Sequence, residues 1–294
     1  TEPLPPIFRN RRKYNKMNPI KTLHLFPKLT KELLKLLRGL KAADWLKPSP
    51  IDGRTIKDLV AHIIDGSLRN ISLQRDNFVD HTNVPTIHSY QDLVDHIQKL
   101  NKDWMIVSRR LSPAILIDLL AFSEKQFYEF LKTKNPKDKA IFSVAWAGET
   151  ESENWFDIAR EYTEKWHHQM QIRLALDKPI LLDTEYSEPL YDTFMLALPH
   201  LYRDFCDFEN GTKIKIRVTG KLNKSWVIEW QRDQWVFTDS NQSDIYTSVE
   251  IPDDIAWIIF TNTDRDKEKY NPKIKINGNK SIGLKLLDLV TVMS

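Results

Sequence analysis

The segment EKWHHQMQIR, residues 164–173, places one carboxylate and two adjacent histidines within a stretch of helical character. On a helix, Glu164 and His168 are four residues apart and face the same side, whereas the side chain of His167 is rotated by about 100°. We therefore expect His167 to point away from the other two. Glu164 and His168 together offer one oxygen and one nitrogen ligand for a divalent metal ion.

A third ligand is available in the segment DLVAHIIDG, where His62 lies among the apolar residues of a second helical stretch. An imidazole on or beside a buried helix face needs a polar partner, because an unpaired buried nitrogen is costly. The set His62, Glu164 and His168 suits Zn²⁺ best, and Ni²⁺ or another transition metal is also compatible. Three protein ligands leave coordination positions open for water or substrate, as in a reactive metal site.

Simpler interpretations of these residues stay open at this point. Glutamate and histidine four residues apart also occur on solvated helix faces. A buried histidine is more often bonded to a carbonyl group than to a metal ion. Two neighbouring side chains raise similar alternatives: Arg173 either binds a substrate carboxylate or is a surface residue, and Trp146 either lines a pocket or belongs to the core.

Helices are predicted to position both parts of this site. Apolar residues recur at helical spacing in four stretches and in a long segment that contains the opening motif and stops before Pro179. Thr55 and Asp58 form a capping-box pattern at the start of the second helix. The pattern predicts an antiparallel bundle of four principal helices in residues 17–180. The stretches are residues 20–40, 56 to the mid-70s, 90–110, 113–131 and 154–176.

Beyond Pro179 the periodicity changes from helical to mixed. The segments KIKIRV, SWVIEWQ, WVF, IYTSVEI and KIKING alternate or are rich in β-branched and aromatic residues, which predicts strands. Gly220 and the pair Asp233 and Gln234 stand at the predicted turns between them. Helices are predicted around them at residues 190–208, 252–260 and 281–290. Residues 187–294 are thus expected to form an α+β domain, and the overall fold class is α+β.

The segments GRTIKDLVAHI and AREYTEKWHHQMQIRLAL, about a hundred residues apart, resemble the DinB-like and mycothiol-dependent maleylpyruvate isomerase families. The resemblance implies an N-terminal four-helix bundle that binds a divalent metal through residues falling on His62, Glu164 and His168. Residues 187–294, most visibly KIKINGNKSIGLKLLDLV, are similar to the α+β C-terminal domain of the same isomerases, which itself resembles sterol-carrier domains.

The chain departs from the isomerase pattern at two positions near the implied ligands. Gln171 stands where the isomerases often have an aspartate, and Arg54 stands where they have an aromatic residue. Both departures bear on the specific isomerase chemistry and leave the ligands untouched. Gln171 is accordingly a candidate for substrate binding together with Arg173 and Trp146.

The function that the resemblance and the ligand set favour is a metal-dependent transferase or isomerase that uses a low-molecular-weight thiol. The ion would hold a water or the thiol and lower its pKa, so that the anion can attack a small electrophilic substrate. No general base is identified. The alternative is a non-enzymatic protein whose C-terminal domain holds an apolar small molecule, with a structural metal or none.

The composition excludes several other classes of protein. The 43 basic residues are interspersed with 40 acidic ones, which does not favour a nucleic-acid partner. A single cysteine, Cys206, permits no intramolecular disulfide and is expected in the core, and no apolar run approaches the ~20 residues of a membrane span. A soluble cytoplasmic protein is therefore expected. Residues 1–16, which are basic and precede Met17, are interpreted as an extension without a role in activity.

Overall fold

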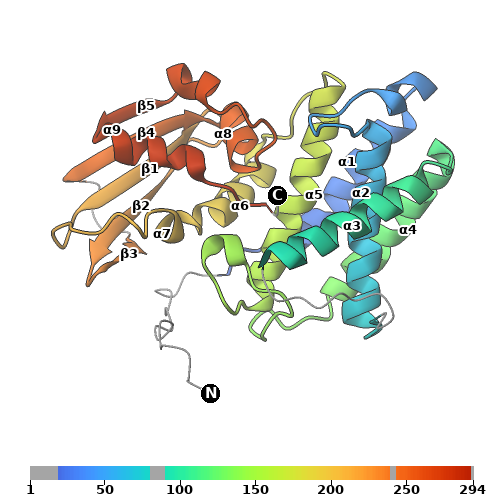
Figure 1. Ribbon diagram of the computed structural model, residues 1–294, viewed down its shortest axis with the longest axis horizontal. Helices are drawn as coiled ribbons and strands as arrows, with labels where there is room; N and C mark the ends of the chain where they lie inside the picture. Colours follow the sequence, from blue (N-terminus) through green and yellow to red (C-terminus); the bar gives the residue numbers. More distant parts are fainter. Residues whose placement is uncertain (1–18, 80–89, 239–242, 293–294) are drawn as a thin grey trace.

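The computed structural model describes residues 19–79, 90–238 and 243–292 of the 294-residue chain. The chain forms a helical part and an α+β part, so the predicted fold class is confirmed (Figure 1). The basic leader, residues 1–16, lies outside the described residues.

The helical part contains the predicted bundle and one additional helix. Helix α1 packs against α4 and α5, and α2 packs against the same two helices, which makes these four the bundle. Helix α3 packs against α2 and therefore lies on the outside of the bundle. The bounds are α1 (Phe26–Arg38), α2 (Ile56–Asn70), α3 (Tyr90–Ser108), α4 (Pro113–Leu131) and α5 (Asn154–Ala175).

Local capping fixes where α2 begins. The Thr55 hydroxyl accepts a hydrogen bond from the Asp58 backbone N–H, and the Asp58 carboxylate accepts one from the Thr55 N–H, as the sequence predicts. Such a cap stabilises a helix by about 1 kcal/mol. Because the start of α2 is set by this pair, the position of His62, about two turns further on, is set as well.

The α+β part is built around a sheet of five described strands in the order β3-β2-β1-β4-β5. Strand β1 is central: it pairs antiparallel with β2 and parallel with β4. In β1, Ile214, Ile216 and Val218 alternate as its buried residues. The bounds are α6 (Thr184–Met195), α7 (Leu198–Leu201), β1 (Lys213–Thr219), β2 (Lys224–Gln231), β3 (Gln234–Phe237), β4 (Ile245–Pro252), α8 (Asp253–Phe260), β5 (Lys275–Gly278) and α9 (Lys280–Leu284).

The turn between β2 and β3 lies one residue earlier than the sequence suggests. Arg232 and Asp233 both have positive φ, +50° and +61°, and Gln234 already belongs to β3. Two consecutive residues with positive φ are typical of the two-residue hairpin turn that matches the twist of the strands. The turn predicted at Asp233 and Gln234 is therefore displaced by the pairing of Gln231 with Gln234.

One apolar cluster continues from the bundle into the α+β part. It includes Tyr162 and Trp166 of α5 together with Trp257 of α8, and the rings of the two tryptophans meet edge to face with centroids 5.6 Å apart. All three side chains are fully buried. Helix α8 thus lies against the bundle on one side and against β1 and β4 on the other (Figure 1). The division of the chain at about residue 180 stays a prediction.

The prediction that Cys206 lies in the core is wrong, because the residue is exposed. It follows α7 in a segment where the flanking Phe205 and Phe208 pack against the core instead. Two aromatic neighbours therefore take the apolar contacts, and the thiol is left on the outside.

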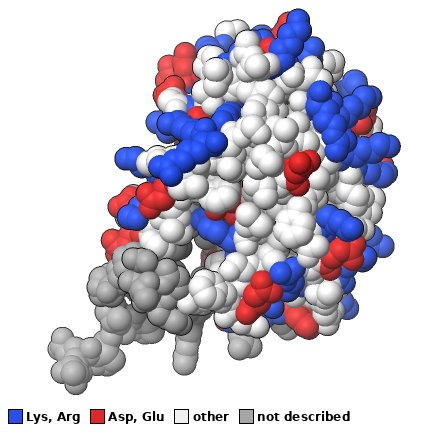
Figure 2. All heavy atoms as spheres, turned by 90° about the vertical axis from the view of Figure 1, so that its right-hand side faces the viewer, with Lys and Arg blue, Asp and Glu red and all other residues white. Residues whose placement is uncertain are grey.

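The side of the molecule formed by the helical part is shown in Figure 2. Lysine and arginine residues lie with aspartate and glutamate mainly around the margin of this face, and its centre is mostly uncharged. A continuous basic track, which binding to a phosphate backbone requires, does not cross the face. Among the described residues, every helix is too short or too polar to span a lipid bilayer.

Candidate functional site

A cavity of about 1520 Å³ lies between the bundle and the segment that follows α8. It is larger than the ~300–1,000 Å³ usual for a pocket that binds one small molecule. The cavity therefore has room for two small molecules at once. Its inner wall includes His62, Gly66, Arg69 and Asn70 of α2, Glu161, Glu164, His167, His168 and Gln171 of α5, and Thr261 and Thr263 beyond α8.

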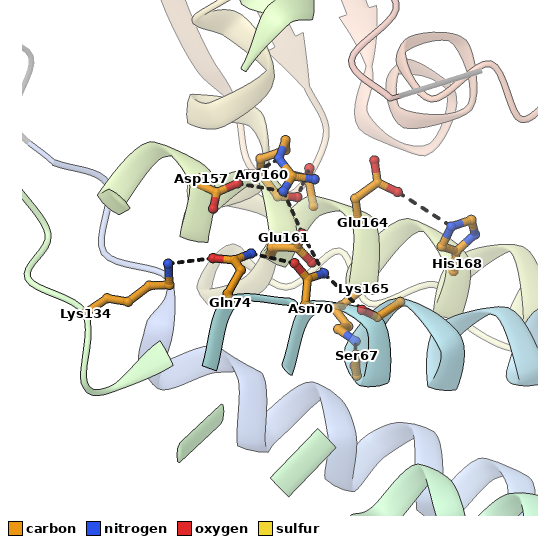
Figure 3. Close-up of polar contacts among 12 residues, drawn as sticks. Ser67, Asn70, Gln74, Lys134, Asp157, Arg160, Glu161, Glu164, Lys165 and His168 are labelled. Carbon is orange, nitrogen blue, oxygen red and sulfur yellow. Dashed lines mark hydrogen bonds and ion pairs between the residues drawn. The ribbon is translucent and has the colours of Figure 1, made fainter. Parts of the chain in front are cut away.

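Glu164 and His168 share one face of α5, as their spacing predicts. The His168 Nε2 lies 3.6 Å from the Glu164 Oε2 (Figure 3). Two ligands that hold one ion at about 2.1 Å and at a tetrahedral angle lie about 3.4 Å apart. The Glu164 side chain is 24% exposed, and it lines the cavity. The pair has the separation and the access that a shared cation would need.

A chain of hydrogen bonds orients His168. Its Nδ1 lies 2.9 Å from the side-chain oxygen of Gln171, and the Gln171 amide nitrogen donates to the Thr263 hydroxyl at 3.0 Å. Since the amide oxygen can only accept, Nδ1 carries the proton and Nε2 keeps its lone pair on the side of Glu164. Both polar ends of Gln171 are occupied, so this residue supports the imidazole although it also lines the cavity.

His62 reaches the same place from α2. Its ring meets that of His168 edge to face, with centroids 4.7 Å apart and planes at 88°. Its Nδ1 is buried and has no hydrogen-bond partner among the described residues. Such an unpaired nitrogen is costly, and for Nδ1 the simpler expectation of a bond to a carbonyl group is not met. Helices α2 and α5 are neighbours, and His62 lies level with His168, as a shared ion would require.

The expectation that His167 points away from the site is wrong. Its ring centroid lies 3.9 Å from that of His168, and Glu164, His167 and His168 offer ligand atoms within 4.8 Å of one another. The His167 Nδ1 bonds to the Thr163 carbonyl at 3.1 Å, one turn back along α5. A rotation of 100° between the Cα–Cβ bonds does not separate two rings that tilt toward each other. Among the described residues, the ligand atoms that lie together are thus those of Glu164, His167 and His168, and His62 joins them only through the contact of its ring with that of His168.

Burial keeps the three imidazoles neutral. It lowers the pKa of His167 to about 4, and burial together with the neighbouring His167 lowers the pKa of His168 to about 3. For His62, burial and then His168 hold the pKa well below the ordinary 6.5. Burial also raises the pKa of Glu164, against the opposing effects of His168 and Arg160. A divalent cation binds neutral nitrogens that have a free lone pair, and a carboxylate whose negative charge is only partly balanced by its neighbours.

A second polar group on α5 lies one turn before this site (Figure 3). Arg160 donates to Asp157 and to Glu161, each at 2.6 Å. A further row of hydrogen bonds runs through Asn70 and Gln74 of the α2 side to Lys134. The guanidinium of Arg160 thus already has two carboxylates as partners. It does not ion-pair with Glu164.

The remaining candidates from the sequence differ in position. Arg173 lies outside the cavity lining: it is buried, donates to the Pro179 carbonyl at 3.1 Å and pairs with Glu32 at 3.4 Å. Trp146 lines the cavity, and its ring packs edge to face on Phe156. The indole N–H of Trp146 is buried without a partner among the described residues. Sequence reasoning missed Thr263, which no spacing relates to His168.

Comparison with known proteins identifies relatives of the bundle and of the whole fold. Residues 26–173, half of the chain, match the family described as "Mycothiol maleylpyruvate isomerase N-terminal domain". Two solved structures of a mycothiol-dependent maleylpyruvate isomerase, one of them a histidine-to-alanine mutant, are similar with a TM-score of 0.51 and 11% sequence identity. Each alignment covers 85% of this chain and 91% of the other. A search of curated proteins found no match.

Proposed function

Because the chain belongs to the mycothiol maleylpyruvate isomerase family, we propose that it is a metal-dependent isomerase or transferase that uses a low-molecular-weight thiol. The proposed ligands are His62, Glu164 and His168. The observation that carries the proposal is the buried Nδ1 of His62, which has no hydrogen-bond partner in the part of the chain that the structure describes. It lies beside His168, whose own Nε2 faces the Glu164 carboxylate.

The donor set fits a divalent cation. Two neutral imidazoles and one carboxylate suit Zn²⁺ above all, and Ni²⁺ is compatible with the same atoms. The Gln171 amide supplies the hydrogen bond that orients a metal-binding histidine. When bound, the ion would lower the pKa of a coordinated thiol so that the thiolate forms near neutral pH.

The chain itself contributes position, charge and space. Glu164 brings one negative charge to the site, and burial keeps His62 and His168 unprotonated. The volume of the cavity would allow a thiol and an electrophile to lie side by side, which would bring the two reactants together. Transfer and isomerisation then differ in whether the thiol stays on the electrophilic carbon or leaves again. Trp146 forms part of the wall against which the substrate would lie.

The alternative function, storage of an apolar molecule in the C-terminal part, has less support. It would require a deep apolar tunnel within residues 187–294. The large cavity lies instead between the bundle and residues 258–270, and its inner wall carries charged and polar side chains. We therefore propose the enzyme alone.

The decisive experiment is metal analysis of protein purified without chelator. The wild-type chain should hold one equivalent of a transition metal, and the variants His62→Ala and His168→Ala should each lose it while the helical circular dichroism stays largely intact. His96→Ala is the matched control, because His96 lines the same cavity outside the ligand set. A wild-type protein without metal, or retention of metal by both ligand variants, would refute the proposal.

A further inference from the structure

Helix α4 carries two large apolar side chains on its outer surface. Ile115 is 46% exposed and Phe122 is 58% exposed, whereas Leu116 and Leu120 of the same helix are buried in the core. A single exposed apolar residue requires no explanation. These two, however, are seven positions apart, and seven residues make almost two full helical turns. They therefore lie on the same outward face of α4.

Charged residues complete this face in a regular order. Asp118 lies between Ile115 and Phe122, and Lys125 lies one turn beyond Phe122. At 100° per residue, the four side chains fall within about 80° of the helix circumference, and we call them the α4 stripe. Asp118 and Lys125 are both exposed, and neither forms a hydrogen bond or an ion pair with a described residue. Their charges are available to a partner.

The order of the charges makes the stripe complementary to a second copy of itself. If two α4 helices cross antiparallel on a two-fold axis beside Phe122, Asp118 of each copy lies opposite Lys125 of the other. The symmetry repeats this ion pair and brings the two Phe122 side chains together at the centre. A parallel arrangement would instead set Asp118 against Asp118. Ala114 and Ala121 flank the stripe, and their small side chains let two helices approach closely.

The surroundings of α4 have the character of a protein contact. Figure 1 places α4 on the side of the molecule that Figure 2 turns toward the viewer. The centre of that face is mostly uncharged, and lysine, arginine, aspartate and glutamate lie mainly around its margin. An apolar centre inside a charged rim is the usual anatomy of a protein–protein interface. Both signs of charge occur in this rim, which favours a partner that also carries both.

We propose that the chain forms a two-fold symmetric homodimer through the outer face of α4, with Phe122 at the centre and an Asp118–Lys125 pair on either side. The inference is independent of the proposed metal site. The dimer would leave the cavity open, because none of the described residues that line the cavity belongs to α4. One helix pair buries less than the ~1,600 Å² of a standard interface, so the dimer should dissociate on dilution at roughly micromolar concentration.

The test is the oligomeric state of the full chain, measured by sedimentation velocity over a wide range of protein concentration. The wild type should dimerise reversibly. Asp118→Lys and Lys125→Asp each set like charges opposite one another twice, and each should weaken the dimer by about ten-fold or more. Phe122→Ser removes the apolar centre and should weaken it by roughly the same factor.

A mixture of the two charge variants gives the sharpest result. In a dimer that contains one Asp118→Lys chain and one Lys125→Asp chain, both pairs again join opposite charges, so mixing should restore the dimer that neither variant forms alone. Lys280→Glu reverses an exposed charge on α9 and is the matched control, which should dimerise like the wild type. Circular dichroism verifies that every variant is folded.

Three results would overturn the proposal. The first is a wild-type chain that stays monomeric at every concentration. The second is a dimer that persists unchanged in both charge variants, which would place the contact on another surface. The third is a mixture of the charge variants that remains monomeric, which would exclude the antiparallel, two-fold arrangement of α4.

Discussion

Two polar groups lie one turn apart on α5 (Figure 3). In the first, Arg160 is shared by Asp157 and Glu161, so that every charge has a partner of opposite sign. In the second, the ion-pair contacts of Glu164 are with the imidazoles of His167 and His168, which burial keeps neutral, and the His62 Nδ1 has no partner among the described residues. The first group is complete as folded. The second leaves a buried nitrogen without a partner among the described residues, and this difference is the reason why we propose the second group, and not the first, as a metal site.

The largest effect on stability is expected when the cation at the centre of the structural cluster, Arg160, is removed. Arg160→Met leaves Asp157 and Glu161 buried without their cation, which should lower the free energy of unfolding by about 3–5 kcal/mol. Denaturant unfolding followed by circular dichroism measures the loss. Arg160→Lys, which keeps the charge, should lose less. The fraction of Arg160→Met that folds should still bind metal, and unchanged stability would show that the cluster is not needed for the fold.

Acid should destabilise the folded protein through the buried histidines of the second group rather than through the Arg160 cluster. In chelator-treated protein, His167 and His168 have folded pKa values of about 4 and about 3, against 6.5 when unfolded. Below pH 6.5 the unfolded chain binds protons that the folded chain does not. As the pH is lowered from 6.5, the free energy of unfolding should therefore decrease by about 1.4 kcal/mol per pH unit for each histidine, until the pH reaches the folded pKa. Above pH 6.5 these two histidines should make the stability neither higher nor lower as the pH changes.

Urea unfolding at pH 7 and pH 5 measures this slope. The double variant His167→Gln with His168→Gln should lack most of it, and metal loading should reduce it, because a bound ion competes with protons. A wild-type protein equally stable at both pH values would contradict the neutral, buried state of the two imidazoles.

A smaller effect, on metal affinity, is expected when only the hydrogen bonds that orient His168 are removed. Gln171→Leu deletes the acceptor that orients His168, and the loss of such a contact typically weakens metal binding by about 10–100-fold. Competition with a chromophoric chelator measures the affinity. Thr263→Val, which removes only the far end of the chain of hydrogen bonds, should cost less. Equal metal affinities for Gln171→Leu and wild type would mean that His168 is positioned by packing alone.

The smallest effect on metal binding is expected from His167→Ala. The Nδ1 of His167 is already bonded to the Thr163 carbonyl, and the proposed set uses His62 in its place. The variant should therefore keep its metal in the same analysis that finds none in His62→Ala. The reverse result would assign the ion to Glu164, His167 and His168 and would remove His62 from the set.

Much of the fold follows from local patterns. The start of α2 was predictable because Thr55 and Asp58 satisfy each other within one turn. The buried alternation of β1 likewise identified a strand. What the pattern does not contain is the position of one helix relative to another, so the placement of α3 outside the bundle could not be foreseen. The β2–β3 turn was missed by one residue because strand pairing, not turn composition, sets the register.

For the site, the sequence predicted on which helix face each candidate ligand lies. Glu164 and His168 share a face because of their spacing, and His62 was expected beside them as the buried imidazole of α2. The inward tilt of His167 depends on a hydrogen bond that helical angles do not describe. Thr263 was invisible for a different reason, since its link to Gln171 spans 92 positions and arises only from tertiary packing.

The bond between Gln171 and Thr263 has a consequence for the order of events during folding. The bundle can form its helices early, because its contacts are local and cost little loop entropy. The orientation of His168, however, waits until the segment after α8 has docked against α5, which requires most of the chain. High-affinity metal binding would then be a late step. A nascent chain that ends before residue 263 would contain the three candidate ligands but not the hydrogen bond that orients His168.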